Sequence, residues 1–527
     1  MNQRSFLHGA FVLIAAGLVT RIMGFVYRIF LTRLIGAQGI GLFQLVFPLL
    51  SLVLTFVTAG LPTAISKLVA EAVVQRDKVR VKRIMTVSST VILTLAVVFT
   101  VLMWTLRGLV RTYWITDARA YPAYLAMIPI TGVIAVASIY RGYFRGLQDM
   151  APTAWGQIIE QSVRILSIWV LAAYFIRFSL PYAAAAAMMG MVLGELSGLI
   201  FLIVQQRRRA RLSQVIPDAP SRSLETTRQT LKALVDIAGP VTFSSLIGSL
   251  IFAVEPVLVT RALLRADIAT HMATTLYGKY GGMAIPLLVF PTVITGALAV
   301  NLVPSVSEAV AGEAKGRVRI RMAQSWRATA MVGFPTSVIL TLFASPLSQM
   351  IFNDGTAGPI LSIIAPAGFL LYLQGPLAGI LQGMNHAGIA MRNSIVGGIA
   401  RLGFIYLLAS DPALGIKGVA WAVTISICLT TSLHFFSLYP KIGFAVNIED
   451  TTRIAIATLI MLAFMEFIRH NGQAWGSVHV LLAIGMGLII YSVLLCSFRV
   501  ITSKTVRKIP RIGDMLAQIV ASMPFAV

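Results

Sequence analysis

The sequence is poor in charged residues, and acidic residues are the scarcest. Charged side chains make up 12% of the 527 residues, with 19 Asp or Glu against 43 Lys or Arg. Soluble proteins carry about 25% charged residues, so this composition excludes an ordinary soluble protein. Hydrophobic residues reach 57%, which is typical of a chain built mostly from membrane-spanning segments.

Signatures of several other protein classes are missing as well. The only two cysteines, Cys428 and Cys496, fall in apolar segments, so we expect neither a structural disulfide nor a metal site. No G-x-x-x-x-G-K-[ST] loop is present, and no Ser/His/Asp set or paired-carboxylate pattern indicates catalysis. The sequence therefore predicts a protein that is not an enzyme and has no cofactor.

Long apolar runs dominate the chain instead. A membrane-spanning helix needs about 20 mostly apolar residues. We count fourteen candidates, at residues 7–31, 40–66, 84–106, 121–143, 153–176, 180–204, 234–260, 280–303, 326–347, 358–381, 389–409, 416–438, 453–469 and 477–498. No small-residue cleavage site follows the first run, which predicts a retained span rather than a signal peptide.

Basic residues gather in every second loop between these runs. The largest clusters lie at 67–83, 205–233 and 315–327, and we count Arg141 and Arg145 with them. Loops rich in Lys and Arg stay in the cytoplasm, so we expect both termini there. Short basic clusters between spans suit an anionic leaflet, which favours membrane lipids over nucleic acid as partners.

The two halves of the chain resemble each other at a constant offset in the numbering. The matched pairs are Gly142 with Gly379, Gly146 with Gly383, Pro129 with Pro366, and Arg164 with Arg401. A Val-Phe-Pro string at 46–48 also recurs at 289–291, and Pro62 falls near the position of Pro304.

This repeat predicts an all-α polytopic membrane protein with two pseudo-symmetric six-helix lobes around a central cavity. The lobes would be residues 1–206 and 234–440, joined by a basic cytoplasmic linker at 207–233. Two additional spans at 441–500 and a cytoplasmic amphipathic tail at 501–527 would follow. Substrate sites in transporters with such repeats lie between the repeats, near the midplane.

The first span carries two arginines on one face. Gly17, Arg21, Gly24 and Arg28 stand at i, i+4, i+7 and i+11, which aligns them along the helix. A charge at membrane depth costs from a few to more than about 10 kcal/mol, so such residues usually face a bundle interior or a wet cavity. We predict that this face lines a cavity for an anionic substrate. The alternatives are that Arg28 snorkels to the outer interface and that Arg21 pairs with an acid.

Other charges interrupt later spans. In the fifth span, Glu160 precedes Arg164 by four residues, which is the order that favours an ion pair on a helix. The pair either belongs to the substrate site or is a neutral pair that fixes helix packing. Its repeat mate keeps Arg401 but has glycine at 397 and 398, so we expect Arg401 to meet a partner on another helix or in the cavity. Glu195 in the sixth span has no evident partner.

Two further residues complete the candidate site. Glu255 precedes Pro256 in the seventh span and serves either ion or proton coupling or as the counter-ion of an arginine. Lys279 would lie at the outer mouth, to contact substrate or to anchor the interface beside two tyrosines. Arginines outnumber acids at these depths, and a guanidinium donates two hydrogen bonds to phosphate at once. This excess of arginines over acids favours a phosphate-bearing substrate over a cationic drug.

Six strings resemble the lipid-linked oligosaccharide flippases of the multidrug/oligosaccharidyl-lipid/polysaccharide (MOP) exporter superfamily. Within it, they resemble the stage V sporulation protein B group, which is related to the lipid II flippases. The strings are RIMGFVYR (21–28), LIGAQGIGLFQ (34–44), FP (47–48), GLPTAISK (60–67), YRGYFRGLQDMAPTA (140–154) and YGKYGGMAIPL (277–287).

The resemblance implies two six-helix bundles around a cationic cavity, with the two added helices forming a groove for a lipid tail. The transported molecule would be an undecaprenyl-pyrophosphate-linked saccharide such as lipid II, carried by alternating access across the bacterial cytoplasmic membrane. Spore cortex synthesis is the implied process, and cell-wall synthesis enzymes are the implied partners.

One position departs from the family pattern. Arg21 matches the first arginine of the flippase motif, but Tyr27 and Arg28 stand where the pattern has arginine and an acid. A one-residue shift turns the charge about 100° around the helix, so the substrate role of Arg28 is left open. The competing functions are a flippase for another lipid-linked polysaccharide unit, a cation-coupled drug antiporter of the same superfamily, and a non-transporting scaffold.

Overall fold

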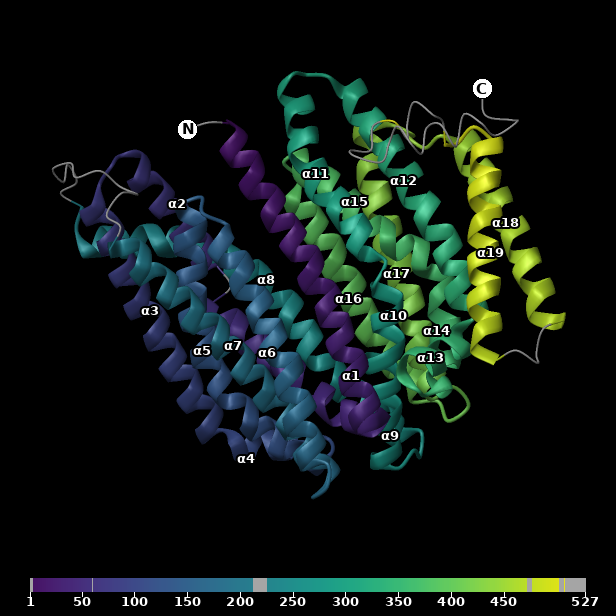
Figure 1. The fold of residues 1–527 in the computed structure, drawn as a ribbon, viewed down its shortest axis with the longest axis horizontal. Coiled ribbons are helices and arrows are strands. Elements are labelled where there is room, and N and C mark those ends of the chain that lie inside the picture. Colours follow the sequence, from purple (N-terminus) through teal and green to yellow (C-terminus); the bar gives the residue numbers. More distant parts are fainter. Residues whose placement is uncertain (1–2, 59, 212–224, 472–475, 502–506, 508–527) are drawn as a thin grey trace. The chain divides into compact units, whose positions relative to one another are not determined.

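The computed structural model describes residues 3–58, 60–211, 225–471, 476–501 and 507. Every regular element in these ranges is helical, as predicted (Figure 1). The chain forms two compact units, one of Met1–Met283 with Ile405–Ile416 and the other of Ala284–Phe404 with Lys417–Val527. The boundaries predicted for the lobes and the linker stay predictions, and nearly all of the predicted tail lies outside the described residues.

The first unit contains the elements of the N-terminal half, up to the π-helix η3, whose last residue belongs to the second unit. They are α1 (Gln3–Thr58), α2 (Leu61–Val74), α3 (Lys78–Thr105), α4 (Arg107–Leu109), η1 (Val110–Trp114), η2 (Ala118–Ala120), α5 (Tyr121–Gly146), α6 (Ala151–Phe175), α7 (Leu180–Arg211), α8 (Thr227–Arg265), α9 (Thr270–Tyr277) and η3 (Gly278–Ala284).

The second unit contains the remaining elements, and α16 ends in the segment that belongs to the first unit. They are α10 (Ile285–Val289), α11 (Thr292–Ala311), α12 (Lys315–Leu342), α13 (Ala344–Phe352), η4 (Gly355–Ala357), α14 (Gly358–Ile364), η5 (Ala365–Ala367), α15 (Gly368–Gly383), α16 (Ala387–Ala409), α17 (Ile416–Ile442), α18 (Ile448–Asn471) and α19 (Gly476–Ser497).

Helices that could cross a membrane occur throughout the described part of the chain. Among the described residues, eleven helical segments are long and apolar enough to cross a membrane, or twelve if α12 and α13, bent by 83°, form one span. The segment Ala16–Val74 combines the first two predicted spans. The shortest predicted span, 453–469, lies within a continuous helix of 24 residues, α18. The chain is thus a multi-pass membrane protein, and the count of fourteen stays a prediction.

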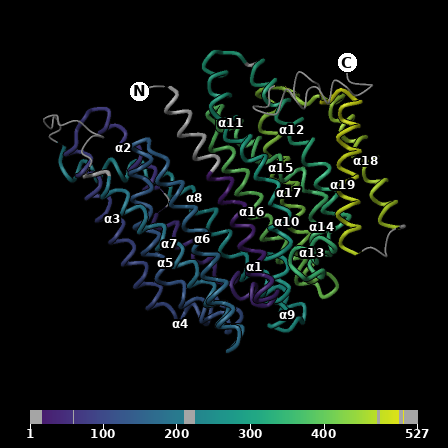
Figure 2. Tube along the Cα trace, in the orientation of Figure 1, coloured from purple at the N-terminus to yellow at the C-terminus, as the bar shows by residue number. Residues whose placement is uncertain are grey.

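The first two predicted spans are separated by a glycine rather than by a loop. Gly36 has φ 68° and ψ −178°, and the helical path of α1 continues on both sides of it (Figure 2). This backbone region is accessible almost only to glycine, because a Cβ would clash with the backbone. Gly36 therefore lets one long helical run change direction without an intervening coil.

Local sequence signals set several helix starts. Proline stands at the first or second position of α2, α5 and α6, where its missing N–H removes no hydrogen bond. Asp77 caps α3 by accepting a hydrogen bond from the Arg80 amide at 2.8 Å. Thr226 and Gln229 form a capping box at the start of α8.

The internal repeat is confirmed by helix bounds that recur at one constant offset in the numbering. Helix α3 maps onto α12, and α5 maps onto α14, η5 and α15 together, with both ends of each in register. Two residues with positive φ, Arg76 and Gln148, recur as Glu313 and Asn385. Asp117 and Asp354, another equivalent pair, each cap a 3₁₀ turn.

The matched glycines explain why this register was preserved. A Cβ on Gly142 would lie 3.0 Å from the Pro62 carbonyl oxygen, and one on Gly379 would lie 2.8 Å from that of Ala299. Position 299 is the repeat equivalent of position 62, so both repeats pack these helices through the same close backbone approach. Only glycine allows such an approach without a shift of the helices.

The second apparent match in the sequence was wrong. The strings at 46–48 and 289–291 follow a larger offset than the matched glycines, and Pro62 was aligned near Pro304. The structure instead makes Ala299 the equivalent of Pro62, because the Pro62 carbonyl oxygen lies against Gly142 and the Ala299 carbonyl oxygen lies against Gly379. Short apolar strings recur by chance, whereas the packing fixes the register.

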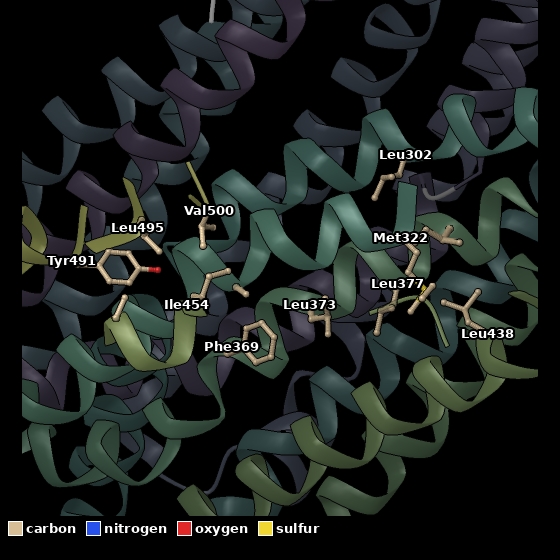
Figure 3. Close-up of a cluster of buried hydrophobic side chains, with 14 of the residues drawn as sticks. Leu302, Met322, Phe369, Leu373, Leu377, Leu438, Ile454, Tyr491, Leu495 and Val500 are labelled. Atoms are coloured by element: carbon tan, nitrogen blue, oxygen red, sulfur yellow. The ribbon is translucent and has the colours of Figure 1, made fainter. Parts of the chain in front are cut away.

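The core of the second unit binds its two C-terminal helices to α12 and α15. Figure 3 shows Phe369 and Leu373 of α15 together with Ile454 of α18 and Tyr491 of α19. The Tyr491 hydroxyl donates to the Met331 carbonyl at 3.0 Å, and Trp326 donates to Thr451 at 3.1 Å. Helices α18 and α19 are therefore an integral part of this unit.

Candidate functional site

The predicted face of α1 is open and positively charged. Arg21 is exposed and makes no hydrogen bond or ion pair within the described ranges. A Cβ added to Gly17 or Gly24 would meet no atom within 4 Å, so no neighbouring helix packs against the glycines of this face. An unpaired arginine cannot lie against lipid at low cost, so this face requires water or an anion.

Arg28 is held on a backbone carbonyl. Its guanidinium Nη1 donates to the Gly281 carbonyl oxygen at 2.8 Å, and Gln44 Nε2 donates to the same oxygen at 2.8 Å. The acceptor lies in the π-helix η3. Such π-helical turns are rare in proteins, and many of those that occur are at functional sites. Arg28 is half-buried. It therefore does not snorkel freely to the interface; it ties α1 to η3.

The crossing of α1 with α9 and η3 depends on two glycines from equivalent positions. A Cβ on Gly278 would overlap the carbonyl oxygen of Ala37, and a Cβ on Gly41 would overlap that of Thr274. Gly41 and Gly278 are repeat equivalents, and so are Ala37 and Thr274. Each segment therefore contacts the other through the same pair of equivalent positions, as two segments related by a local two-fold axis do. It places Gln44 beside η3.

Glu255 of α8 lies at the same π-helix. It is buried and accepts a hydrogen bond from the Tyr280 hydroxyl at 2.8 Å. Tyr277 and Tyr280 are both buried, with ring centroids 6.0 Å apart. Lys279 between them is half-buried and makes no hydrogen bond or ion pair within the described ranges.

Glu160 and Arg164 form the predicted i, i+4 pair, at 2.6 Å. They belong to a larger cluster that also includes Arg141 of α5 and Glu195 of α7. Arg141 Nη2 lies 2.9 Å from both Glu160 and Glu195, and Arg164 lies 3.3 Å from Glu195. We call these four residues the charge cluster. Two arginines and two glutamates give it no net charge.

Close helix packing creates this cluster. A Cβ on Gly194 would lie 2.8 Å from the Glu160 carbonyl oxygen and 3.0 Å from Arg164 Cβ, so α7 approaches α6 through a glycine next to Glu195. The three helices lie side by side in Figure 1. Glu195 therefore has partners that the sequence did not reveal, and Arg141 is an internal helical residue rather than the free loop cation counted in the sequence.

The equivalent helices of the second unit have no such acid. Gly397, the repeat mate of Glu160, lies against Thr430 of α17, and its carbonyl oxygen accepts from the Ser426 hydroxyl at 2.9 Å. Any side chain at 397 would displace Thr430. Arg401 is half-buried on α16 and has an interaction partner. That this partner lies on another helix or in the cavity stays a prediction.

The departure at positions 27 and 28 has a structural counterpart. The Tyr27 hydroxyl is buried, has no hydrogen-bond partner within the described ranges, and lies within electrostatic reach of Arg164 and Arg28. No group of three or more His, Cys, Asp and Glu that could hold a metal occurs among the residues described.

Among the predicted site residues, the charges that remain without partners in the described ranges are positive. Glu160 and Glu195 are neutralised by arginines, and Glu255 is hydrogen-bonded by Tyr280. Arg21 and Lys279 have no counter-charge within the described ranges. The structure thus brings Arg28, Glu255 and the segment of Lys279 together around η3, and it places Glu160 and Arg164 in the charge cluster.

Sequence comparisons place these features in a family. Residues 6–310 match the family model described as "Polysaccharide biosynthesis protein". The chain is 35% identical to "Stage V sporulation protein B" of Bacillus subtilis (strain 168), over 98% of this chain and 100% of that protein. It is 23% identical to "Lipid II flippase MurJ" of the same organism, over 94% and 95%.

Two solved structures share the fold. "Lipid II flippase MurJ, inward closed conformation" superposes with a TM-score of 0.71 at 13% identity, covering 93% of this chain and 98% of that one. An inward-facing multidrug resistance MATE family transporter of the MOP superfamily gives a TM-score of 0.64 at 16% identity, covering 80% and 94%. Both likenesses concern the fold alone.

Proposed function

Because the chain belongs to the polysaccharide biosynthesis protein family, we propose that it is a flippase for a lipid-linked saccharide. The observation that carries the proposal is the unpaired Arg21 on the open face of α1. A transporter that moves an anionic headgroup needs a cation at membrane depth that the protein does not neutralise itself. Arginine suits that role because its planar fork donates two hydrogen bonds to a phosphate.

The proposed substrate is lipid II, the undecaprenyl-pyrophosphate-linked peptidoglycan precursor. Its pyrophosphate would bind Arg21, with Lys279 as a second cation, and the carrier would alternate its access between the two sides of the cytoplasmic membrane. The similarity to a stage V sporulation protein B and to a lipid II flippase supports this choice, and it makes spore cortex synthesis the proposed process. Membrane potential or an ion gradient would drive transport, with cell-wall synthesis enzymes as partners and both termini in the cytoplasm.

Arg28 and Glu255 have different roles in this proposal. Arg28 is bonded to the Gly281 carbonyl, so it would reach a substrate only after leaving that oxygen. Glu255 is bonded to Tyr280 on the same π-helix, which makes it a candidate for ion coupling near the site. Glu160 and Arg164 would shape the neighbouring wall through the charge cluster rather than bind the phosphates directly.

A second candidate is a flippase for another undecaprenyl-linked glycan. The observation that favours it is Arg28 on a backbone carbonyl beside the buried Tyr27, which changes the surface offered to a headgroup. A cationic-drug antiporter of the same fold is disfavoured, because the unpaired charges among the candidate site residues are positive and the acids among them are bonded. A scaffold without transport has no use for an unpaired Arg21 inside a spanning helix.

The test is headgroup accessibility in cells depleted of their own lipid II flippase. Cells would express the wild type, Arg21→Gln, or Arg177→Gln, which removes an exposed cation just beyond the end of α6. An enzyme added outside then cleaves the lipid II that has reached the outer leaflet. We expect the wild type and Arg177→Gln to restore cleavage, and Arg21→Gln at equal abundance to lose most of it.

Failure of the wild type to restore cleavage, with the protein abundant in the membrane, would contradict lipid II as substrate. The same assay with another undecaprenyl-linked glycan would then test the second candidate. Equal rescue by Arg21→Gln would contradict the cationic site while leaving the substrate assignment standing.

A further inference from the structure

A groove with two cations in its lining lies between the first half of α3 and the first turns of α8. It has a volume of about 450 Å³, and both helices belong to the first unit. Among the described residues that line it, two are basic and none is acidic. They are Val79, Lys82, Arg83, Thr86, Val87, Thr90 and Val91 of α3, with Thr227 and Leu231 of α8.

The positive charge of this groove is not neutralised by the protein. Lys82 is exposed, and its side chain makes no hydrogen bond or ion pair within the described ranges. Arg83 is half-buried and donates a hydrogen bond to the Glu225 carbonyl oxygen, which carries no net charge. The Glu225 carboxylate is instead paired with Arg80 at 2.6 Å. Two cations of the groove are therefore available to an anion.

The length of α3 places these cations at the depth of lipid headgroups. Its 28 residues extend about 42 Å, close to the roughly 40–45 Å of a bilayer with its headgroup regions. Lys82 stands about 6 Å along the helix from its first residue, and Val91 about 20 Å. The groove thus runs from the headgroup region into the hydrocarbon region.

The lining changes along α3 in the order of the parts of a phospholipid. The cations come first, at 82 and 83, where a phosphate would lie. The hydroxyls of Thr86 and Thr90 follow one and two turns after Lys82, and Val87 and Val91 follow at the same spacing after Arg83. A free phosphate would use only the first part of this surface, whereas a lipid would use all of it.

We propose that the α3–α8 groove binds an anionic phospholipid, with its phosphate on Lys82 and Arg83 and its acyl chains along Val87 and Val91. The unneutralised charge selects an anionic headgroup over a zwitterionic one. The basic clusters of the sequence predict that this end of α3 faces the cytoplasm, where an anionic leaflet attracts cations. The bound lipid would contact both helices and so hold the start of α8 on α3. This proposal does not depend on the transported substrate.

The experiment measures lipid binding to the purified full-length protein by native mass spectrometry. Dioleoylphosphatidylglycerol and dioleoylphosphatidylcholine, which have the same chains, are titrated into the detergent solution. We expect the first phosphatidylglycerol to bind on the order of tenfold more tightly than the first phosphatidylcholine. Lys82→Gln should weaken phosphatidylglycerol binding about fivefold, because one cation near an anionic headgroup contributes about 1 kcal/mol.

A matched variant controls for the loss of charge alone. Lys417 is also an exposed lysine near the start of a long helix, α17, and it lies outside the groove. Lys417→Gln should leave phosphatidylglycerol binding unchanged. Equal affinity of the wild type for the two lipids, or equal losses from Lys82→Gln and Lys417→Gln, would overturn the proposal.

A second pair of variants tests the shape of the groove while both cations remain. Thr86→Phe fills the groove and should weaken phosphatidylglycerol binding by a similar factor. Thr94→Phe makes the same change at an exposed position of α3 outside the lining, and should have no effect. Binding that is unchanged in Thr86→Phe would overturn the proposal, because the lipid would then lie elsewhere.

Two further measurements separate the lipid from other occupants. Inorganic phosphate that displaces phosphatidylglycerol at an equal concentration would overturn the proposal in favour of a free-anion site. Arg21→Gln should bind phosphatidylglycerol as the wild type does. Loss of phosphatidylglycerol binding in Arg21→Gln would mean that the lipid occupies the proposed transport site, and would also overturn the assignment to the α3–α8 groove.

Discussion

At the scale of single residues, charge pairing separates structural from functional groups. Glu160 and Glu195 each contact two arginines, so the cluster is neutral and its members hold α5, α6 and α7 together. Arg21 lies on α1 with no such partner within the described ranges. A charge inside a spanning segment is costly without a partner, so Arg21 and Lys279 are the residues expected to meet an anionic ligand.

Removal of one acid from the charge cluster should destabilise the protein strongly. Glu195→Gln leaves two arginines facing one carboxylate, and breaking a buried pair in this way costs about 3–5 kcal/mol. Thermal unfolding of the purified protein in detergent should show a clear loss, and Arg141→Gln combined with Glu195→Gln should recover part of it. The control is Glu466→Gln, which removes an exposed i, i+3 pair with Arg469 and should cost at most about 1 kcal/mol. Equal losses from Glu195→Gln and Glu466→Gln would contradict the structural role of the cluster.

Asp117 gives a pH-dependent prediction outside the spanning segments. Burial alone would raise the pKa of its carboxyl group, but hydrogen bonds from the Arg119 side chain at 2.7 Å and from Thr274 at 2.8 Å outweigh burial and lower it. A lowered pKa contributes stability that is present above the ordinary carboxyl pKa of about 3.9 and is lost as pH falls through the folded-state pKa.

Asp117→Asn should therefore destabilise the protein at neutral pH by about 2 kcal/mol. The difference from the wild type should shrink as the pH falls below about 4, which thermal unfolding over a pH series would measure. Asp354→Asn, at the exposed equivalent turn, is the control and should have a smaller effect. A difference in stability between the wild type and Asp117→Asn that does not change with pH would contradict the electrostatic explanation.

At the scale of elements, the sequence predicted helix positions well and their junctions poorly. Hydrophobic runs marked the spans because about 20 apolar residues are needed to cross a membrane. The same runs did not show that α1 continues through Gly36, or that the predicted span 280–303 is divided among η3, α10 and α11. These junctions depend on single backbone angles and on a π-helical turn, which hydropathy does not encode.

Gly36→Ala tests the junction in α1. The backbone at Gly36 has φ 68°, and an added Cβ would meet no atom within 4 Å, so any cost comes from backbone strain rather than from a clash. We expect a loss of about 1–3 kcal/mol in stability, measured by thermal unfolding, together with reduced transport. Gly24→Ala in the same helix also has open space but ordinary helical geometry, so it should be neutral or slightly stabilising. If both substitutions behave alike, Gly36 is not a required break.

The site was only partly predictable from the sequence, because its bonds connect distant segments. The i, i+4 pair of Glu160 and Arg164 follows from helical spacing. Arg141 and Glu195 are 54 residues apart, and Arg28 and Gly281 are 253 residues apart, so no local pattern joins them. A signal was nevertheless present: glycines near these residues, at 194 and 278, allow the backbone approach that brings the partners together.

At the scale of the whole molecule, a duplicated helical unit has diverged in what it does with equivalent positions. The repeat preserves helix ends, turn residues and glycine contacts at one constant offset. Charge is not preserved: the acid at 160 corresponds to Gly397, and only the arginine recurs. Packing constrains both copies alike, whereas a binding surface is free to differ between them.

The family assignment and the charge balance together define the central claim. A fold shared with both a lipid II flippase and a multidrug transporter does not select a substrate. The unpaired cations do select a chemical class, because they favour an anion over a cation. The central proposal is that Arg21, with Lys279 as a second cation, binds the phosphates of a lipid-linked saccharide.

The most direct measurement is the affinity of the purified protein for undecaprenyl pyrophosphate and for uncharged undecaprenol, in lipid nanodiscs. The account predicts that the wild type and Arg177→Gln bind the pyrophosphate on the order of tenfold or more tightly than the alcohol, and that Arg21→Gln loses most of that difference. Equal discrimination by Arg21→Gln and the wild type would contradict the account, because the phosphates would then be recognised elsewhere.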